Sequence, residues 1–298
     1  MGEVSVPGKA PRRRAAIPAS NGSRTAAGAR AGPDLSQERK LWRAGHQVVA
    51  GMDEVGKGAW AGPLTVGVAV MTKGVRKIPK GLRDSKQVPE ITREKIFTPV
   101  GKWCAAWGVG HSSAQECDEL GMTRALRLAA RRAFACLPPQ AFPTAIVLDG
   151  KFDFVSRKGD PQLPFGETTE DPEIELSHVC LPDGSCPEVT TVVKGDDRCA
   201  SVAAASVLAK VSRDRLMRAD AGCYPPFDFD SNKGYPSPTH KVAIRGYGLT
   251  AIHRRTWAFV DWLTVEERLV RDVLSGQGDG IQTELIERDL ADLEPEGL

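Results

Sequence analysis

Apolar strands that end in acidic residues constrain the fold of this chain more than any other feature of its sequence. Each of three strand-like runs is followed within three residues by a carboxylate, and a glycine lies within two residues of an acid in each case. The runs cover residues 48–52, 145–148 and 190–193, and the acids that follow them are Asp53, Glu54, Asp149 and Asp196. Because ligand sites of α/β proteins gather where strands end, we expect these acids to meet in one site.

Each acid taken alone has an ordinary explanation. Asp149 precedes a glycine, as turn residues do, and Asp196 could simply cap the helix that follows it. Together, however, carboxylates about 5 Å apart repel by roughly 3 kcal/mol per pair at an effective dielectric constant of about 20. Bound cations would make such a cluster reasonable, and oxygen ligands suit Mg²⁺ or Mn²⁺. Since adjacent strand residues point to opposite faces, Glu54 is expected to lie in the turn if it shares a site with Asp53.

A glycine-rich turn follows the first pair of acids. Gly56 and Gly58 bracket Lys57 in this turn. Because glycines have no side chain, they let backbone N–H groups approach a phosphate closely. Carboxylates for a metal beside donors for a phosphate indicate phosphoryl-transfer chemistry.

The order of the expected elements predicts an α/β fold. Three hairpin-like strands are followed by strands that are joined through helices, a pattern typical of a mixed sheet covered by helices. The expected strands cover residues 48–53, 64–71, 104–109, 145–148 and 190–193. A short helix is expected to begin at Pro89, and longer ones to cover 114–137 and 199–217.

Composition divides the 298 residues into three parts. Residues 1–40 are rich in Ala, Gly, Arg, Pro and Ser, which predicts a disordered basic tail. Residues 41–262 are the expected folded domain, and a chain with 41% hydrophobic residues can bury a proper core. Residues 263–298 are expected to be an acidic, partly disordered extension, since positions 266–298 carry ten acids and three arginines.

Charge and cysteine content narrow the class of protein. A net charge of +2 says little, but the basic loop at 73–86 is compatible with nucleic-acid contact as well as with a solvated face. None of the seven cysteines forms a Cys-x-x-Cys pair, which argues against zinc. The chain has no membrane-length apolar run and no signal-peptide core, so we expect a cytoplasmic protein without membrane contact. We also expect a monomer.

Seven motifs resemble those of the ribonuclease HII family. They are Asp53-Glu54-Val55-Gly56-Lys57-Gly58-Ala59-Trp60-Ala61-Gly62-Pro63, Asp84-Ser85-Lys86, Leu148-Asp149-Gly150, Val193-Lys194-Gly195-Asp196, residues 201–214, Lys233-Gly234-Tyr235 and Ile252-His253-Arg254-Arg255. Each is modest alone, but all occur in the family's order across roughly residues 47–258. The resemblance implies a ribonuclease H-like fold, with a mixed five-stranded sheet flanked by helices and a helical C-terminal part.

The resemblance also implies an activity. Members of the family cut the RNA strand of RNA–DNA hybrids and cut at ribonucleotides embedded in duplex DNA. The implied reaction is hydrolysis with two divalent ions, Mn²⁺ or Mg²⁺, which leaves 5′-phosphate and 3′-hydroxyl ends. Primer removal during replication and repair of misplaced ribonucleotides are both compatible with that activity.

The motifs carry the family's site residues onto this chain. Asp53, Glu54, Asp149 and Asp196 match its catalytic, metal-binding carboxylates. Gly56, Lys57 and Gly58 match the loop that holds the ribonucleotide's 2′-hydroxyl and the neighbouring phosphate, and Tyr235 matches a tyrosine that stacks on the sugar at the RNA–DNA junction. Ser85 and Lys86 match a phosphate-contacting segment. Asp214 is expected to pair with a helix arginine, and His253 to pack in the C-terminal half.

Three departures from the family's pattern leave alternatives open. Lys57 stands where the family usually has arginine. A compact ammonium charge therefore replaces a planar guanidinium group, which can bind a phosphate through two hydrogen bonds. The stretch 153–187 is expected to be an insert, and both tails lie outside the resemblance.

A ribonuclease HIII-like enzyme is a second possibility, although residues 1–40 are too short and too polar for that family's N-terminal domain. A catalytically silent hybrid-binding module is a third, although it would need a broken metal site.

Overall fold

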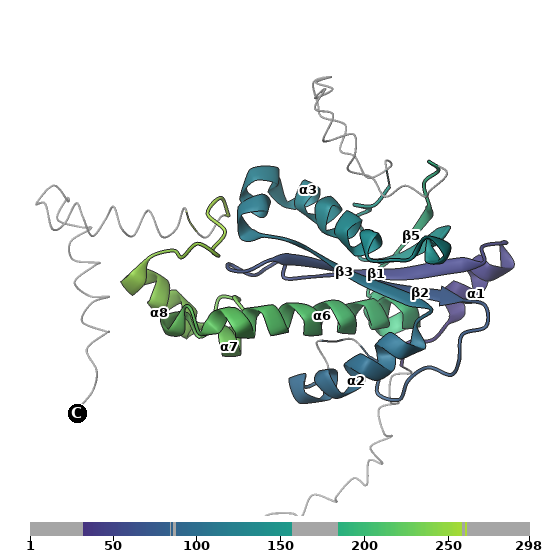
Figure 1. Cartoon of the computed structure of the whole chain (residues 1–298), viewed down its shortest axis with the longest axis horizontal. Helices are drawn as coiled ribbons and strands as arrows, with labels where there is room; N and C mark the ends of the chain where they lie inside the picture. Colours follow the sequence, from purple (N-terminus) through teal and green to yellow (C-terminus); the bar gives the residue numbers. More distant parts are fainter. Residues whose placement is uncertain (1–31, 84, 86–87, 157–183, 258–259, 261–298) are drawn as a thin grey trace, which may run out of the picture. The chain divides into compact units, whose positions relative to one another are not determined.

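The computed structural model describes residues 32–83, 85, 88–156, 184–257 and 260 (Figure 1). The expectations for residues 1–31, for most of the 153–187 insert, for the 263–298 extension and for Lys86 therefore lie outside the described residues. In the part of the chain that is described, no helix is both long enough and apolar enough to cross a membrane.

A five-stranded mixed sheet forms the centre of the fold. Its strands are β1 (Val48–Val55), β2 (Leu64–Thr72), β3 (Ala106–Ser112), β4 (Ala145–Asp149) and β5 (Glu188–Val192), in the spatial order β3-β2-β1-β4-β5. β1, β2 and β3 pair antiparallel, whereas β4 and β5 run parallel to β1. The predicted mixed sheet is confirmed, although β3 begins and ends later than the expected 104–109.

Helices cover both faces of this sheet (Figure 1). α3 (Ala114–Ala135) lies on one face, and α6 (Ala200–Ala221) lies on the other. The other helices in the described residues are α1 (Ser36–Arg43), α2 (Glu90–Trp103), α5 (Gly195–Arg198), α7 (Phe229–Asn232) and α8 (Pro238–Tyr247), with short 3₁₀ turns at Pro139–Ala141 and Pro225–Phe227. Alternate residues of the strands therefore enter two separate cores, one under each long helix.

Small residues allow the backbone of α6 to pack directly against the backbone of the sheet. A Cβ atom at Gly51 would lie 2.1 Å from the backbone carbon of Ser201, and one at Gly67 would lie 2.5 Å from the Ala205 carbonyl oxygen. The alanine-rich face of α6 meets these glycines, so neither partner has room for a larger side chain. The close packing fixes α6 relative to β1 and its acids.

The expected domain boundary at residue 40 is wrong, because the compact unit begins at Gly32 and includes α1. Leu35 and Trp42 enter the core beneath α6, which offsets the polar composition of the segment. Glu38 is fully buried, and its Oε1 accepts hydrogen bonds from the backbone N and the Oγ of Ser201, at 2.9 and 2.5 Å. α1 thus supplies a capping side chain for the N-terminus of α6 from a distant part of the chain.

Candidate active site

The sheet topology brings the strand-end acids together. β1, β4 and β5 are parallel neighbours, so their carboxyl ends share one edge of the sheet. Asp53 follows the last residue of β1 that pairs with β4, and Asp149 is the final residue of β4. Asp196 lies in α5, which directly follows β5. The predicted meeting of three strand ends is therefore present in the fold.

The pKa shifts of Asp53 and Glu54 indicate that these acids lie near the other carboxylates. Burial raises the pKa of Asp53 well above its ordinary value, and the charges of Glu54, Asp149 and Asp196 raise it further. A hydrogen bond with the Ser206 side chain acts in the opposite direction. Burial also raises the pKa of Glu54, where Lys57 opposes the effect and Asp149 adds to it. Positive charge placed among these carboxylates would favour their ionised forms.

Glu54 lies in the strand and not in the turn, which corrects the expectation from its sequence position. It is the second-last residue of β1 and pairs with Val66 of β2. β1 continues for three residues beyond its last pair with β4, Met52↔Leu148. At this end β1 still pairs with β2, and the charge of Asp149 raises the pKa of both Asp53 and Glu54, although the two acids are neighbours in a strand.

The four carboxylates are suitable ligands for a hard divalent cation, but several of their oxygens accept hydrogen bonds from nearby backbone N–H groups. Asp149 Oδ1 accepts a hydrogen bond from the Gly195 backbone N at 2.6 Å, and Asp196 Oδ1 accepts one from the Asp197 N at 3.0 Å. Asp53 Oδ1 likewise accepts from the Glu54 N at 2.8 Å. As they stand, no three His, Cys, Asp or Glu side chains within the described ranges are arranged to hold a metal ion. The residues fit Mn²⁺ or Mg²⁺ in chemistry and location, provided that these side chains turn.

The glycine-rich turn beside the acids has a fixed backbone. Gly56 has a φ of +90°, and a Cβ atom there would lie 2.4 Å from Nε of Arg213 and 2.8 Å from the Pro63 carbonyl oxygen. Gly58, in contrast, faces open space. Lys57 is half exposed, and its Nζ lies 3.6 Å from Oε1 of Glu54. The side chain that replaces the expected arginine thus reaches a carboxylate of the acid cluster.

Two buried arginines hold this turn, and the sequence patterns predicted a role for neither. Arg213 donates from Nε to the Pro63 carbonyl at 2.8 Å and from Nη2 to the Ala61 carbonyl at 3.1 Å. Arg254 donates from Nη2 to the Gly62 carbonyl at 3.1 Å and from Nη1 to the Lys57 carbonyl at 3.4 Å. Both arginines lie within motifs quoted above, but motifs do not reveal which carbonyls a side chain will bind.

Ser85 is turned inward. Its side chain is 2% exposed, and its Oγ lies 2.8 Å from Oγ of Ser206 on α6. Arg93 of α2 donates to the Ser85 carbonyl at 2.8 Å. In this arrangement the hydroxyl faces α6 rather than solvent, and a phosphate contact from Ser85 stays a prediction.

Tyr235 is half-buried next to cationic groups. The Arg213 guanidinium lies 5.4 Å from the centroid of its ring, and Lys210 Nζ lies 5.7 Å from it. Asp214 binds Lys210 at 2.5 Å and Arg93 at 3.3 Å, so its expected pairing with an arginine is confirmed. His253 is 1% exposed, and its expected packing role is confirmed as well.

The fold and the acid cluster define the class of ribonuclease H-like nucleases, and comparison with known proteins narrows it. Residues 50–165 and 173–260 match the family model of ribonuclease HII. The ribonuclease HII of Streptomyces avermitilis is 44% identical over 233 residues, which cover 78% of this chain and 86% of that protein. The chain belongs to the ribonuclease HII family and is a ribonuclease H enzyme.

Solved structures agree with this assignment. The ribonuclease H2 from Pyrococcus horikoshii is 28% identical, with a TM-score of 0.52, and the match covers 74% of this chain and 99% of that one. Bst-RNase HIII, whose structure was solved in complex with Mn²⁺, is 20% identical with a TM-score of 0.51 and covers 74% of this chain and 70% of that one. The second likeness shows the fold alone, and the family match favours ribonuclease HII over the HIII-like alternative.

Proposed function

We propose that this protein hydrolyses the RNA strand of RNA–DNA hybrids and cuts at single ribonucleotides embedded in duplex DNA, leaving 5′-phosphate and 3′-hydroxyl ends. The observation that carries the proposal is the convergence of four acids on three adjoining strand ends, where burial and mutual repulsion raise the pKa of Asp53. Membership of the ribonuclease HII family supports the same reading. The protein acts as a cytoplasmic monomer in this proposal.

Asp53, Glu54, Asp149 and Asp196 would hold two divalent ions, Mn²⁺ or Mg²⁺. When bound, such ions supply an activated water and charge stabilisation for the leaving 3′-oxygen. Asp53 lies deepest of the acids and is fixed by Ser206 and by the Glu54 backbone N, so it would be the most firmly held of the metal ligands. The charge of Lys57, 3.6 Å from Glu54, lowers the pKa of this acid against the effect of burial.

The substrate is held by three groups of residues in this proposal. Backbone donors of Gly56, Lys57 and Gly58 read the 2′-hydroxyl, which is the group that distinguishes RNA from DNA. The Lys57 ammonium meets the adjacent phosphate as a point charge. The Tyr235 ring stacks on the sugar at the RNA–DNA junction, and Ser85 and Lys86 belong to a further phosphate contact.

Cleavage of two substrates in two metals tests the proposal. One substrate is a duplex with one embedded ribonucleotide, and the other is a hybrid with a continuous RNA strand. Metal-dependent cutting of both, with 5′-phosphate and 3′-hydroxyl products, is the expected result in Mn²⁺ or in Mg²⁺. Binding of both substrates without any cutting would instead identify the chain as a silent hybrid-binding module.

A further inference from the structure

Two buried histidines lie behind Tyr235, outside the acid cluster. His240 belongs to α8 and His253 follows it, and their side chains are 0% and 1% exposed. Phenylalanine rings surround them: the Phe229 centroid lies 5.3 Å from that of His240, and the Phe227 centroid lies 5.1 Å from that of His253. The two imidazoles meet at 2.9 Å between their Nε2 atoms.

The hydrogen-bond partners fix which nitrogen of each ring carries a proton. The Thr250 backbone N, which can only donate, lies 2.9 Å from Nδ1 of His253, so the His253 proton is on Nε2. That Nε2–H donates to Nε2 of His240, which leaves the His240 proton on Nδ1. This Nδ1–H donates to the Tyr235 carbonyl at 2.9 Å. Burial lowers the pKa of both histidines, in agreement with two neutral rings.

Gly234, the residue before Tyr235, is hydrogen-bonded to the segment that directly follows the glycine-rich turn. The Gly234 carbonyl accepts hydrogen bonds from the backbone N of Trp60 at 2.8 Å and of Ala61 at 3.2 Å. A Cβ atom at Gly234 would lie 2.3 Å from the Ala61 carbonyl oxygen, so the backbones of the two segments are in direct contact. Tyr235 is thus held between the histidines on one side and residues 60–61 on the other.

We propose that His240 and His253 are positioning residues for Tyr235, whose carbonyl they hold through the one-way chain Thr250–His253–His240–Tyr235. The proposal rests on the proposed function, in which the Tyr235 ring stacks at the RNA–DNA junction. Neither histidine touches substrate. They keep the Tyr235 ring at a fixed distance from the turn at residues 56–58, so that a single ribonucleotide can contact the ring and the turn at the same time.

Two substitutions of His240 test its two hydrogen bonds, to Tyr235 and to His253, separately. In His240→Asn the amide nitrogen takes the place of Nδ1 and can still donate to the Tyr235 carbonyl. In His240→Gln the amide takes the place of Nε2, so the donor to Tyr235 is lost. We expect His240→Gln to lower kcat/KM on the single-ribonucleotide duplex about fivefold, the factor for one ordinary hydrogen bond, and His240→Asn to lower it less. Equal losses in the two variants would overturn the proposal.

The Tyr235→Ala background distinguishes positioning from general damage. Tyr235→Ala should itself lose activity on the single-ribonucleotide duplex, and His240→Gln should then cause no further loss. If His240→Gln costs the same factor in both backgrounds, it does not act through Tyr235 and the proposal is wrong. If Tyr235→Ala loses no activity, the stacking role in the proposed function fails, and with it the purpose of the histidine chain.

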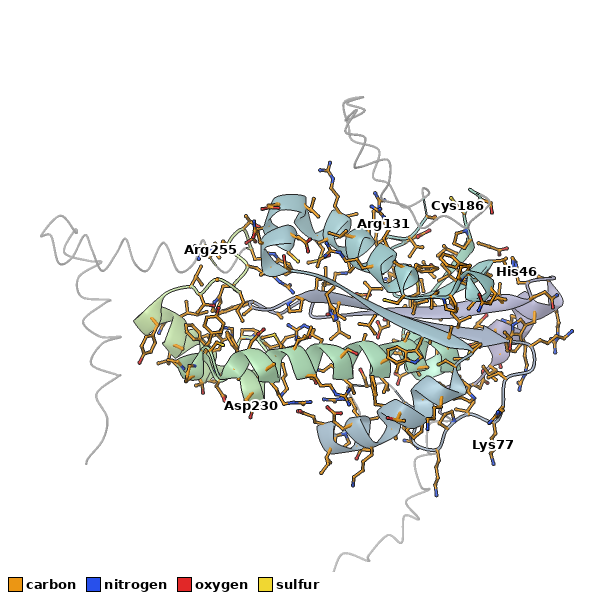
Figure 2. The ribbon with its side chains drawn as sticks, in the orientation of Figure 1. His46, Lys77, Arg131, Cys186, Asp230 and Arg255 are labelled. Carbon is orange, nitrogen blue, oxygen red and sulfur yellow. The ribbon has the colours of Figure 1, made fainter. Side chains whose placement is uncertain are left out.

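One measurement on the unaltered protein guards against variants that fail to fold. The ¹⁵N shifts of the imidazoles report tautomers directly, and we expect Nδ1–H for His240 and Nε2–H for His253. An Nε2–H tautomer for His240 would contradict the chain. His46→Gln is a matched control for the substitutions, because His46 bonds Thr144 and Glu188 and lies at the other end of the molecule from Arg255, the labelled residue nearest His253 in sequence (Figure 2).

Discussion

At the residue scale, Lys57 joins the acid cluster to the glycine-rich turn. Its Nζ lies 3.6 Å from Glu54, while its carbonyl accepts from Arg254. The lysine charge therefore lowers the pKa of Glu54 against the effect of burial. Arginine at this position could hold a phosphate with two parallel hydrogen bonds, an option that the lysine lacks.

Substitution of Lys57 should affect short ribonucleotide targets most. Lys57→Arg is expected to keep the cleavage position and to raise kcat/KM modestly on a single embedded ribonucleotide, where few 2′-hydroxyls assist binding. Lys57→Ala should lose about tenfold or more on that substrate, as for one charge-assisted hydrogen bond, and less on a continuous hybrid. Equal kinetics for the three proteins on both substrates would leave Lys57 as a solvated turn residue.

The buried histidine pair gives stability a defined pH dependence. Burial lowers the pKa of His253 from 6.5 to about 3, and His240 and Arg255 add to the shift. The unfolded chain binds this proton more readily than the folded protein, so the stability from neutral His253 is complete above pH 6.5 and is lost as the pH falls toward 3.

Denaturant unfolding at several pH values tests this sign. As the pH falls below 6.5, the wild type should lose up to about 1.4 kcal/mol of unfolding free energy per pH unit relative to His253→Gln, which cannot take up that proton. Parallel pH profiles for the two proteins would show that His253 titrates normally in the folded state.

At the element scale, α6 organises the site. Its residues Ser206 and Arg213 reach Asp53 and the turn, and its Lys210 lies 5.7 Å from the centroid of the Tyr235 ring. The position of α6 depends on close contact with Gly51 and Gly67 and on the cap that Glu38 supplies to its first turn. Part of the site geometry is therefore set by α1, which lies far from Asp149, Asp196 and α6 in the sequence.

Removal of the Glu38 cap should destabilise the protein. Glu38→Ala leaves the Ser201 N–H and hydroxyl without their buried acceptor, which is expected to cost about 1–3 kcal/mol of unfolding free energy. Arg39→Ala, at the exposed neighbouring position, is the control and should cost little. A Glu38→Ala protein as stable as this control would mean that α1 does not support α6.

Sequence patterns predicted the strands and the strand-end acids because burial and acidity are local properties of consecutive residues. They failed for α1, since polar residues outnumber Leu35, Leu41 and Trp42, the apolar residues of this segment that enter the core. They also gave no role to Arg213, Arg254 or His240, because the partners of these side chains are backbone carbonyls in distant segments. Such contacts depend on tertiary structure and leave no periodicity in the sequence.

At the scale of the whole molecule, one continuous unit from Gly32 onward carries the site. Asp34 pairs with Cys199 in an isolated bridge, and Glu38 caps α6, so residues before 41 contribute to the fold that holds Asp196. The basic residues before 32 and the acidic ones after 263 lie outside the motifs.

Two truncations place the functional boundary. A protein that begins at residue 32 should keep its melting temperature and its cleavage of hybrids. One that begins at residue 41 should melt several degrees lower, because it lacks Leu35 and Glu38 and each kilocalorie is worth about 2–4 °C at this size. Identical melting temperatures for the two proteins would restore the boundary expected from composition.

The central claim is that four carboxylates form one metal-dependent site, and Asp149→Asn tests it most directly. The asparagine can still accept the hydrogen bond from the Gly195 N–H, so the fold should survive, while one charge of the metal site is removed. The measurement is cleavage of a duplex with one embedded ribonucleotide in Mn²⁺, wild type against Asp149→Asn. We expect the variant to lose more than about a hundredfold in rate, beyond the loss typical of residues that only support metal ligands. Near-normal turnover by a folded Asp149→Asn protein would contradict the four-carboxylate site.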